Sequence, residues 1–116
     1  MQDTINWGAA ALMSRTIDEG TSSVFRSQPM AQHFARISKC AEEVGEAVEA
    51  FIGCTGQNFR KGVTHKWGDV YSELCDVTLT GAYALTHFVG AEAAKQYIQL
   101  RQEYHHKRVD LPWEEQ

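Results

Sequence analysis

The chain has 116 residues, a mass of 13.1 kDa, 43% hydrophobic residues and a formal net charge of -4. That length supports one hydrophobic core, so we expect a single domain over residues 1–116. The basic residues form no long run, which argues against a nucleic-acid duplex as partner. No stretch approaches the roughly 18 apolar residues of a membrane span, and the start lacks a signal-peptide pattern. We therefore expect a cytoplasmic protein that does not enter a membrane.

The three cysteines, Cys40, Cys54 and Cys75, form no C-x-x-C pair. Their odd number indicates neither a disulfide framework nor a thiolate zinc site. We interpret them as small apolar core residues in a reducing compartment.

The first expected helix covers about residues 4–19 and has a weak apolar pattern. The strongest helix follows, because its apolar residues recur at alternating steps of four and three and so lie on one stripe. These residues are Met30, Phe34, Ile37, Ala41, Val44, Val48, Phe51 and Ile52. Ser27 and Pro29 predict where this helix begins, and Gly53 with Gly56 predict where it ends. We expect the stripe to be buried inside the subunit.

Residues 54–68 form a connection that is longer than most and carries three glycines and several cations. A second apolar stripe then predicts a helix that ends at Gly90. Its members are Val70, Leu74, Val77, Gly81, Leu85 and Phe88. A weaker helix over 91–107 follows, and no run of alternating β-branched residues predicts a strand. The expected architecture is an all-α four-helix bundle.

Two acidic pairs lie on the two long helices. Glu43 and Glu46, like Glu73 and Asp76, are three residues apart, so each pair presents two carboxylates on one helix surface. Two such pairs facing each other would form the oxygen-rich site that Mg²⁺ or Mn²⁺ prefers. Periodicity alone also allows the alternative of a solvated polar face opposite the apolar stripe.

Gly45 and Gly81 lie inside the two long helices, where a glycine costs about 1 kcal/mol relative to alanine. A closely approaching backbone or ligand would explain them, as would a helix irregularity. Ala47 and Ala50 lie on the polar side of the first long helix and make it less polar. We expect a second copy of the chain to cover this carboxylate side, with the two glycines permitting close approach.

The segment E42-E-V-G-E46, followed after 26 residues by E73-L-C-D76, resembles the E-E-x-x-E…E-x-x-D signature of the MazG-like all-α nucleoside triphosphate pyrophosphohydrolases. R36-I-S-K39 precedes it, and the resemblance covers about residues 36–88. It implies a four-helix bundle of the all-α NTP pyrophosphatase type that assembles into homodimers or homotetramers. It also implies a Mg²⁺-dependent hydrolase that cleaves a (d)NTP between its α and β phosphates to (d)NMP and pyrophosphate.

The resemblance also implies roles for single residues. Glu43, Glu46, Glu73 and Asp76 would hold Mg²⁺, for which Mn²⁺ could substitute. Glu42 and Glu43 are the candidate catalytic residues, with Glu42 either positioning and deprotonating the attacking water or adding a further ligand.

A triphosphate carries about four negative charges, so cationic side chains are expected to assist the metal. Lys39, Arg60 and Lys61 are the candidates for phosphate contacts, the alternative being ordinary surface cations. His33, Thr80 and Tyr83 are the candidates for sugar or base contacts, and Tyr83 stands where the family often has Asn. Trp7 and Phe34 could also stack on a base, unless they serve as core residues.

The substrate stays open among aberrant nucleotides, dUTP and a purine dNTP such as dGTP. A ferritin-like di-metal oxidase would need a Glu-x-x-His on each of two helices, whereas this chain has only Glu103 with His106. The alternative function is a non-enzymatic helical interaction module whose acidic face binds a partner.

Overall fold

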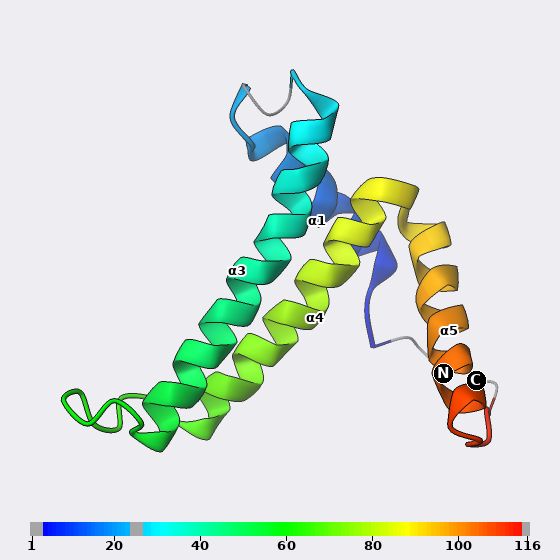
Figure 1. Cartoon of the computed structure of the whole chain (residues 1–116). Coiled ribbons are helices and arrows are strands. Elements are labelled where there is room, and N and C mark those ends of the chain that lie inside the picture. The colour runs from blue at the N-terminus through cyan, green and yellow to red at the C-terminus, as the bar shows by residue number, and fades with distance from the viewer. Residues whose placement is uncertain (1–3, 24–26, 115–116) are drawn as a thin grey trace.

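The structure, a computed structural model, describes residues 4–23 and 27–114. It contains the helices α1 (Trp7–Gly20), α3 (Pro29–Thr55), α4 (Trp67–Val89) and α5 (Ala91–Arg108), as Figure 1 shows. The described residues include no strand, so the prediction of an all-α chain with four helices is confirmed.

Local sequence explains where the helices begin and end. The Asn6 side chain caps α1 by accepting a hydrogen bond from the Ala9 N–H at 2.9 Å. Pro29 opens α3 after Gln28, so Ser27 is not the capping residue. Gly56 ends α3 in the left-handed conformation with a φ of 69°, and Gly90 ends α4 with a φ of 84°.

The prediction that Gly53 helps to end α3 is wrong. Gly53 lies buried inside the helix, which continues to Thr55. A Cβ at this position would overlap the side chains of Thr64 and His65. The Gly53 carbonyl also accepts hydrogen bonds from the backbone N–H groups of Thr64, at 2.9 Å, and His65, at 3.3 Å. The returning end of the connection therefore packs directly on α3, and only a glycine leaves room for it.

The helices α3 and α4 form a long antiparallel hairpin, and α1 crosses it near the C-terminal end of α4 (Figure 1). The helix α5 packs against α4 and α1 and then diverges from the hairpin. The radius of gyration is 17.1 Å, whereas a compact domain of this length has about 13 Å. The four helices therefore do not close into a bundle within one chain.

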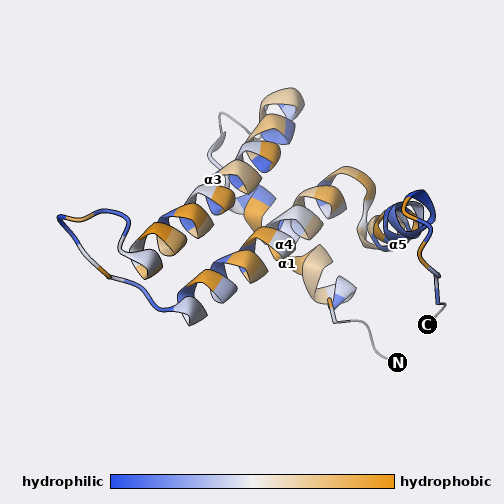
Figure 2. Cartoon of the chain, turned by 60° about the horizontal axis from the view of Figure 1, so that its bottom comes forward, coloured by the Kyte–Doolittle hydropathy of each residue, from blue (hydrophilic) through white to orange (hydrophobic). Residues whose placement is uncertain are grey.

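The buried apolar residues are all small: Ala10, Ala50, Val70, Ala82, Ala84 and Ala94. No large side chain among the described residues is fully buried. The prediction that the apolar stripe of α3 is buried is wrong, since Phe34, Ile37 and Val48 are more than half exposed. The reason is that the buried residues of α3, Arg36, Ala50 and Gly53, lie on another side of the helix, so the packing of α3 in the hairpin leaves this stripe uncovered. Figure 2 shows hydrophobic residues along both α3 and α4, whereas α5 is mostly hydrophilic.

The cysteines are free, but Cys75 is exposed and Cys40 and Cys54 are only partly buried, so the prediction of core cysteines is wrong. None of the described helices is long and apolar enough to cross a membrane.

Candidate metal centre

The seam between α3 and α4 brings carboxylates of both helices together. Glu43, Glu73 and Asp76 each offer one carboxylate oxygen, and these three oxygens lie within 4.8 Å of one another. The Glu43 side chain is only 13% exposed and Glu73 is half-buried, while Asp76 is exposed. The two acidic pairs thus meet across the hairpin, and the alternative of a fully solvated polar face does not describe Glu43 and Glu73.

Glu46 stands beside this trio. Glu46 follows Glu43 by one turn of α3, and its charge is, after partial burial, the next cause that raises the pKa values of Glu43 and Glu73. All four predicted ligands therefore occupy one region of the seam, although Glu46 is not among the three whose oxygens converge.

Neighbouring carboxylates and partial burial make it unfavourable for Glu43 and Glu73 to be ionised together. Partial burial raises the pKa of Glu43, the charge of Glu46 raises it further, and Lys39 opposes the shift. Partial burial also raises the pKa of Glu73, and its neighbours Glu46 and Asp76 add to this. Carboxylates in this situation bind a proton or a cation more readily than isolated ones do.

Glu73 supplies a direct test of whether a cation fits. Its Oε2 atom is buried and has no hydrogen-bond partner, which is costly for a carboxylate oxygen. A metal ion bound by Glu43, Glu73 and Asp76 would satisfy this oxygen. The donors are all carboxylate oxygens, which suit a hard cation such as Mg²⁺ or Mn²⁺.

Lys39 and Glu42 lie at the edge of the cluster. The Lys39 ammonium is 3.1 Å from a Glu42 carboxylate oxygen and 3.9 Å from one of Glu43. The hydrogen bond that the Lys39 ammonium donates to Glu42 is the main cause that raises the pKa of Lys39. Glu42 is 58% exposed and Lys39 is 45% exposed, so both face solvent beside the more enclosed trio.

On α4, Thr80 follows Asp76 by one turn and Tyr83 follows it by about two, and both side chains are partly buried. Arg60 and Lys61 are exposed in the connection that projects beyond the end of the hairpin (Figure 1). About 13 Å of helix separates Glu46 from the end of α3. The structure therefore places Thr80 and Tyr83 on the helix that carries the ligands, but it does not bring Arg60 and Lys61 to the carboxylates.

The aromatic candidates lie away from the carboxylates. His33 precedes Glu43 by ten residues, or about 15 Å of helix, and its ring contacts those of His87 and Phe88 at centroid distances of 5.0 and 4.8 Å. Phe34 is 69% exposed, so it is not a core residue. None of these rings meets the three converging carboxylates.

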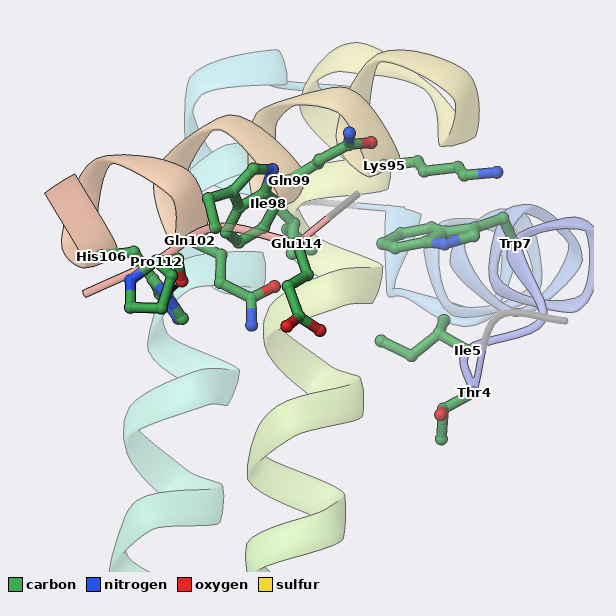
Figure 3. A pocket seen from close by; sticks show the side chains of 11 residues that line it. Thr4, Ile5, Trp7, Lys95, Ile98, Gln99, Gln102, His106, Pro112 and Glu114 are labelled. Carbon is green, nitrogen blue, oxygen red and sulfur yellow. Dashed lines mark hydrogen bonds between the residues drawn. The ribbon is translucent and has the colours of Figure 1, made fainter. Parts of the chain in front are cut away.

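Trp7 lines an open cleft of about 730 Å³, drawn in Figure 3. In Figure 3, Ile5 lies on the same side of the cleft as Trp7, and Ile98 and Gln102 lie on the opposite side. Trp113 also lines the cleft. None of the described residues that line the cleft belongs to α3 or α4. None of the candidate metal ligands therefore takes part in the cleft that Trp7 lines.

Sequence reasoning missed a polar network at the junction of α1, α3 and α4. Arg36, only 4% exposed, lies 3.6 Å from Asp18 and donates to the Ser14 hydroxyl at 3.4 Å. Its burial lowers the pKa of its guanidinium, and the charge of Asp18 opposes this shift. Asp18 also contacts His87, which reaches His33. These residues form no motif in the sequence, because they are up to 69 positions apart.

Comparisons with known protein families, with curated proteins and with solved structures give no match for this chain. Its function is therefore argued from the sequence motif and the geometry of the carboxylates.

Proposed function

We propose that the chain is a Mg²⁺-dependent nucleoside triphosphate pyrophosphohydrolase of the MazG-like all-α type. It would cleave a (d)NTP between the α and β phosphates and release (d)NMP and pyrophosphate. The observation that carries the proposal is the convergence of Glu43, Glu73 and Asp76 within 4.8 Å, from two helices whose motifs have the spacing of that family.

Glu43, Glu73 and Asp76 would hold the ion, with Glu46 beside them as a further ligand. Bound Mg²⁺ supplies the positive charge that attracts phosphate oxygens, neutralises the pyrophosphate leaving group and lowers the pKa of water. The acidic chain needs such a bridge, because its own carboxylates repel a triphosphate.

The other residues at the edge of the cluster would act on the substrate directly. Lys39 stands 3.9 Å from Glu43 and is nearly half exposed, so its ammonium can turn toward a phosphate oxygen. Glu42 is exposed next to it, where its carboxylate can orient the attacking water and accept its proton. Thr80 and Tyr83, further along α4, remain the candidates for the sugar or base.

The nucleotide itself is proposed only as a class. A purine dNTP such as dGTP is one candidate, together with dUTP and aberrant nucleotides. A hydrolase of this class would act in the cytoplasm, where its triphosphates are found, and would work as an oligomer of helical bundles.

The experiment is a panel of dNTPs and NTPs, each incubated with Mg²⁺ or Mn²⁺, with pyrophosphate release as the readout. Wild type should release pyrophosphate and (d)NMP in equal amounts, and Glu73→Gln should lose this activity. Glu49→Gln is the matched control, because Glu49 is exposed on α3 and is not one of the motif's ligands. Release of orthophosphate, or no turnover with any nucleotide, would refute the proposal and favour the interaction module.

A further inference from the structure

Two histidine rings and one carboxylate form a chain of hydrogen bonds where α1 crosses the α3–α4 hairpin (Figure 1). His87 Nδ1 on α4 lies 2.8 Å from Asp18 Oδ2 on α1. His33 Nδ1 on α3 lies 2.8 Å from His87 Nε2. The His87 side chain is only 8% exposed and His33 is half-buried, so water does not freely replace either contact. We call Asp18, His87 and His33 the histidine junction.

The histidine junction has room for a fixed number of hydrogens. Because an ionised Asp18 only accepts hydrogen bonds, His87 Nδ1 carries a hydrogen. At 2.8 Å the two facing ring nitrogens share a single hydrogen, since one of them must donate and the other accept. If His87 is charged, His33 Nδ1 carries no hydrogen, and if His33 is charged, His87 Nε2 carries none. The two rings can therefore hold one positive charge between them but not two.

The charges around the rings also disfavour a second proton. Arg36 of α3 is 4% exposed, and its Nε lies 3.6 Å from Asp18 Oδ1. The other titratable group beside it is Cys40, whose thiol donates to the Arg36 carbonyl at 3.7 Å. Arg15 of α1 lines a cavity together with Asp18 and His87, and no described residue of α5 that lines it is charged. Two arginines thus already face one carboxylate, so a further positive charge is repelled where there is little water.

The junction can nevertheless exchange protons with the solvent. The cavity that Asp18 and His87 line has a volume of about 310 Å³, and Ser14 and Thr86 are also among its lining residues. The Asp18 side chain is 25% exposed. Water therefore reaches the polar atoms of the junction, and the protonation of the rings can follow the pH of the surroundings.

The helix α1 has little apolar packing to hold it in place without these contacts. Its buried residues are Ala10 and Ser14, which are both small, whereas Leu12 is 58% and Met13 is 44% exposed. Burial of small side chains contributes little hydrophobic free energy. The polar contacts at Asp18 are therefore a large part of what fixes α1 on the hairpin.

We infer that the histidine junction is a pH-sensitive switch that holds α1 on the α3–α4 hairpin and releases it when both His33 and His87 are charged. The second proton requires the hydrogen bond between the rings to break, so the open junction binds one proton more than the closed one. Falling pH therefore favours opening, and rising pH closes the junction again. Histidine is the side chain that ordinarily titrates between about pH 5 and 8, so we expect the change in that range.

The inference does not depend on the proposed function, because neither ring belongs to the carboxylate cluster of the candidate metal centre. The first test is hydrogen exchange of the full chain with a chelator present, read by mass spectrometry at about pH 7.5 and about pH 5.5. After correction for the intrinsic pH dependence of exchange, the open fraction of α1 should rise by about tenfold or more, since opening takes up one proton. Residues 45–53, at the closed end of the hairpin, should keep their protection. Equal protection of α1 at both pH values would overturn the inference.

His33→Gln removes one titrating ring but keeps a partner for His87 Nε2. The glutamine amide group can donate to a neutral His87, and its carbonyl oxygen can accept from a charged one. We therefore expect α1 of this variant to stay protected at the lower pH. His105→Gln is the matched control, because His105 is exposed on α5 and lies outside the junction, and it should behave as wild type. If α1 opened equally in His33→Gln and wild type, the inference would be wrong.

A measurement on wild type alone decides the question if His33→Gln fails to fold. The ring carbon signals of the five histidines are followed by NMR from about pH 8 to about pH 5.5. The second of His33 and His87 to become charged should do so together with the loss of exchange protection in α1. Two charged rings in a chain whose α1 stays protected would overturn the inference.

Discussion

His87 Nδ1 lies 2.8 Å from Asp18 Oδ2, and this contact joins α4 to α1. An ionised carboxylate only accepts hydrogen bonds, so His87 Nδ1 is the donor in this contact. His33 Nδ1 lies 2.8 Å from His87 Nε2, so a second hydrogen bond joins the two rings. Because the same carboxylate also pairs with buried Arg36, Asp18 fixes the junction of three helices.

We predict that Asp18→Asn lowers the free energy of unfolding by about 3 kcal/mol, since loss of the carboxylate leaves the buried Arg36 charge without its partner. Denaturant unfolding followed by circular dichroism measures this. Glu19→Gln is the control, because Glu19 is adjacent and exposed, and its effect should stay within about 0.5 kcal/mol. Equal effects of the two substitutions would show that the Asp18 contacts contribute little.

Divalent metal should stabilise the folded chain. A cation that binds Glu43, Glu73 and Asp76 only when they are brought together raises the free energy of unfolding by about 2.7 kcal/mol at a hundred times its Kd. The melting temperature should therefore rise with Mg²⁺ or Mn²⁺ and return after chelation. Glu73→Gln should lose most of the rise, whereas Glu49→Gln should keep it. If neither Mg²⁺ nor Mn²⁺ changed the melting temperature, the cluster would bind neither ion.

Stability without metal should depend on pH in a direction set by the same carboxylates. The pKa values of Glu43 and Glu73 are raised above their ordinary value of 4.5. The folded state therefore keeps these protons to higher pH than the unfolded state, and its stability falls as pH rises from about 4.5 through the raised values.

Melting temperatures across this pH range, measured with a chelator, check that direction against a Glu43→Gln, Glu73→Gln double variant. The difference between wild type and the variant isolates the two groups from all other titrating residues. We expect wild type to lose stability relative to the variant as pH increases. A difference that is flat, or that has the opposite sign, would refute the direction of the shifts.

The sequence predicted the helices well, because their signals are local. The steps of four and three along α3, Pro29 at its start and the left-handed Gly56 at its end all act within a few residues. Periodicity also put Val44 and Val48 on one side of α3, but it does not say what covers that side. The residues of α3 that are buried, among them Ala50 and Gly53, lie on another side of the helix, and the apolar stripe stays exposed.

The candidate site was predictable to the extent that it repeats a local spacing. Each acidic pair, Glu43 with Glu46 and Glu73 with Asp76, lies within one helical turn, so the sequence shows it directly. The packing of α3 on α4 then brings the two pairs to the same place. The junction around Asp18 had no such signal, since its contacts depend on three helices meeting at one place. Arg60 and Lys61 were chosen by charge alone, and the path of the connection carries them away from the carboxylates.

Two glycines of α3 should respond to alanine in opposite ways. A Cβ at Gly53 would overlap Thr64 and His65, whose backbone N–H groups are bonded to the Gly53 carbonyl, so the connection would have to move. Gly45 lies in the same helix, and beyond its chain neighbours and the nearby backbone of α3 itself, no atom lies within 4 Å of a Cβ added there. We expect Gly53→Ala to cost about 1 to 3 kcal/mol and Gly45→Ala to add up to about 1 kcal/mol from helix propensity. Urea unfolding of both variants measures the pair, and stabilisation by Gly53→Ala would show that the connection does not pack on α3.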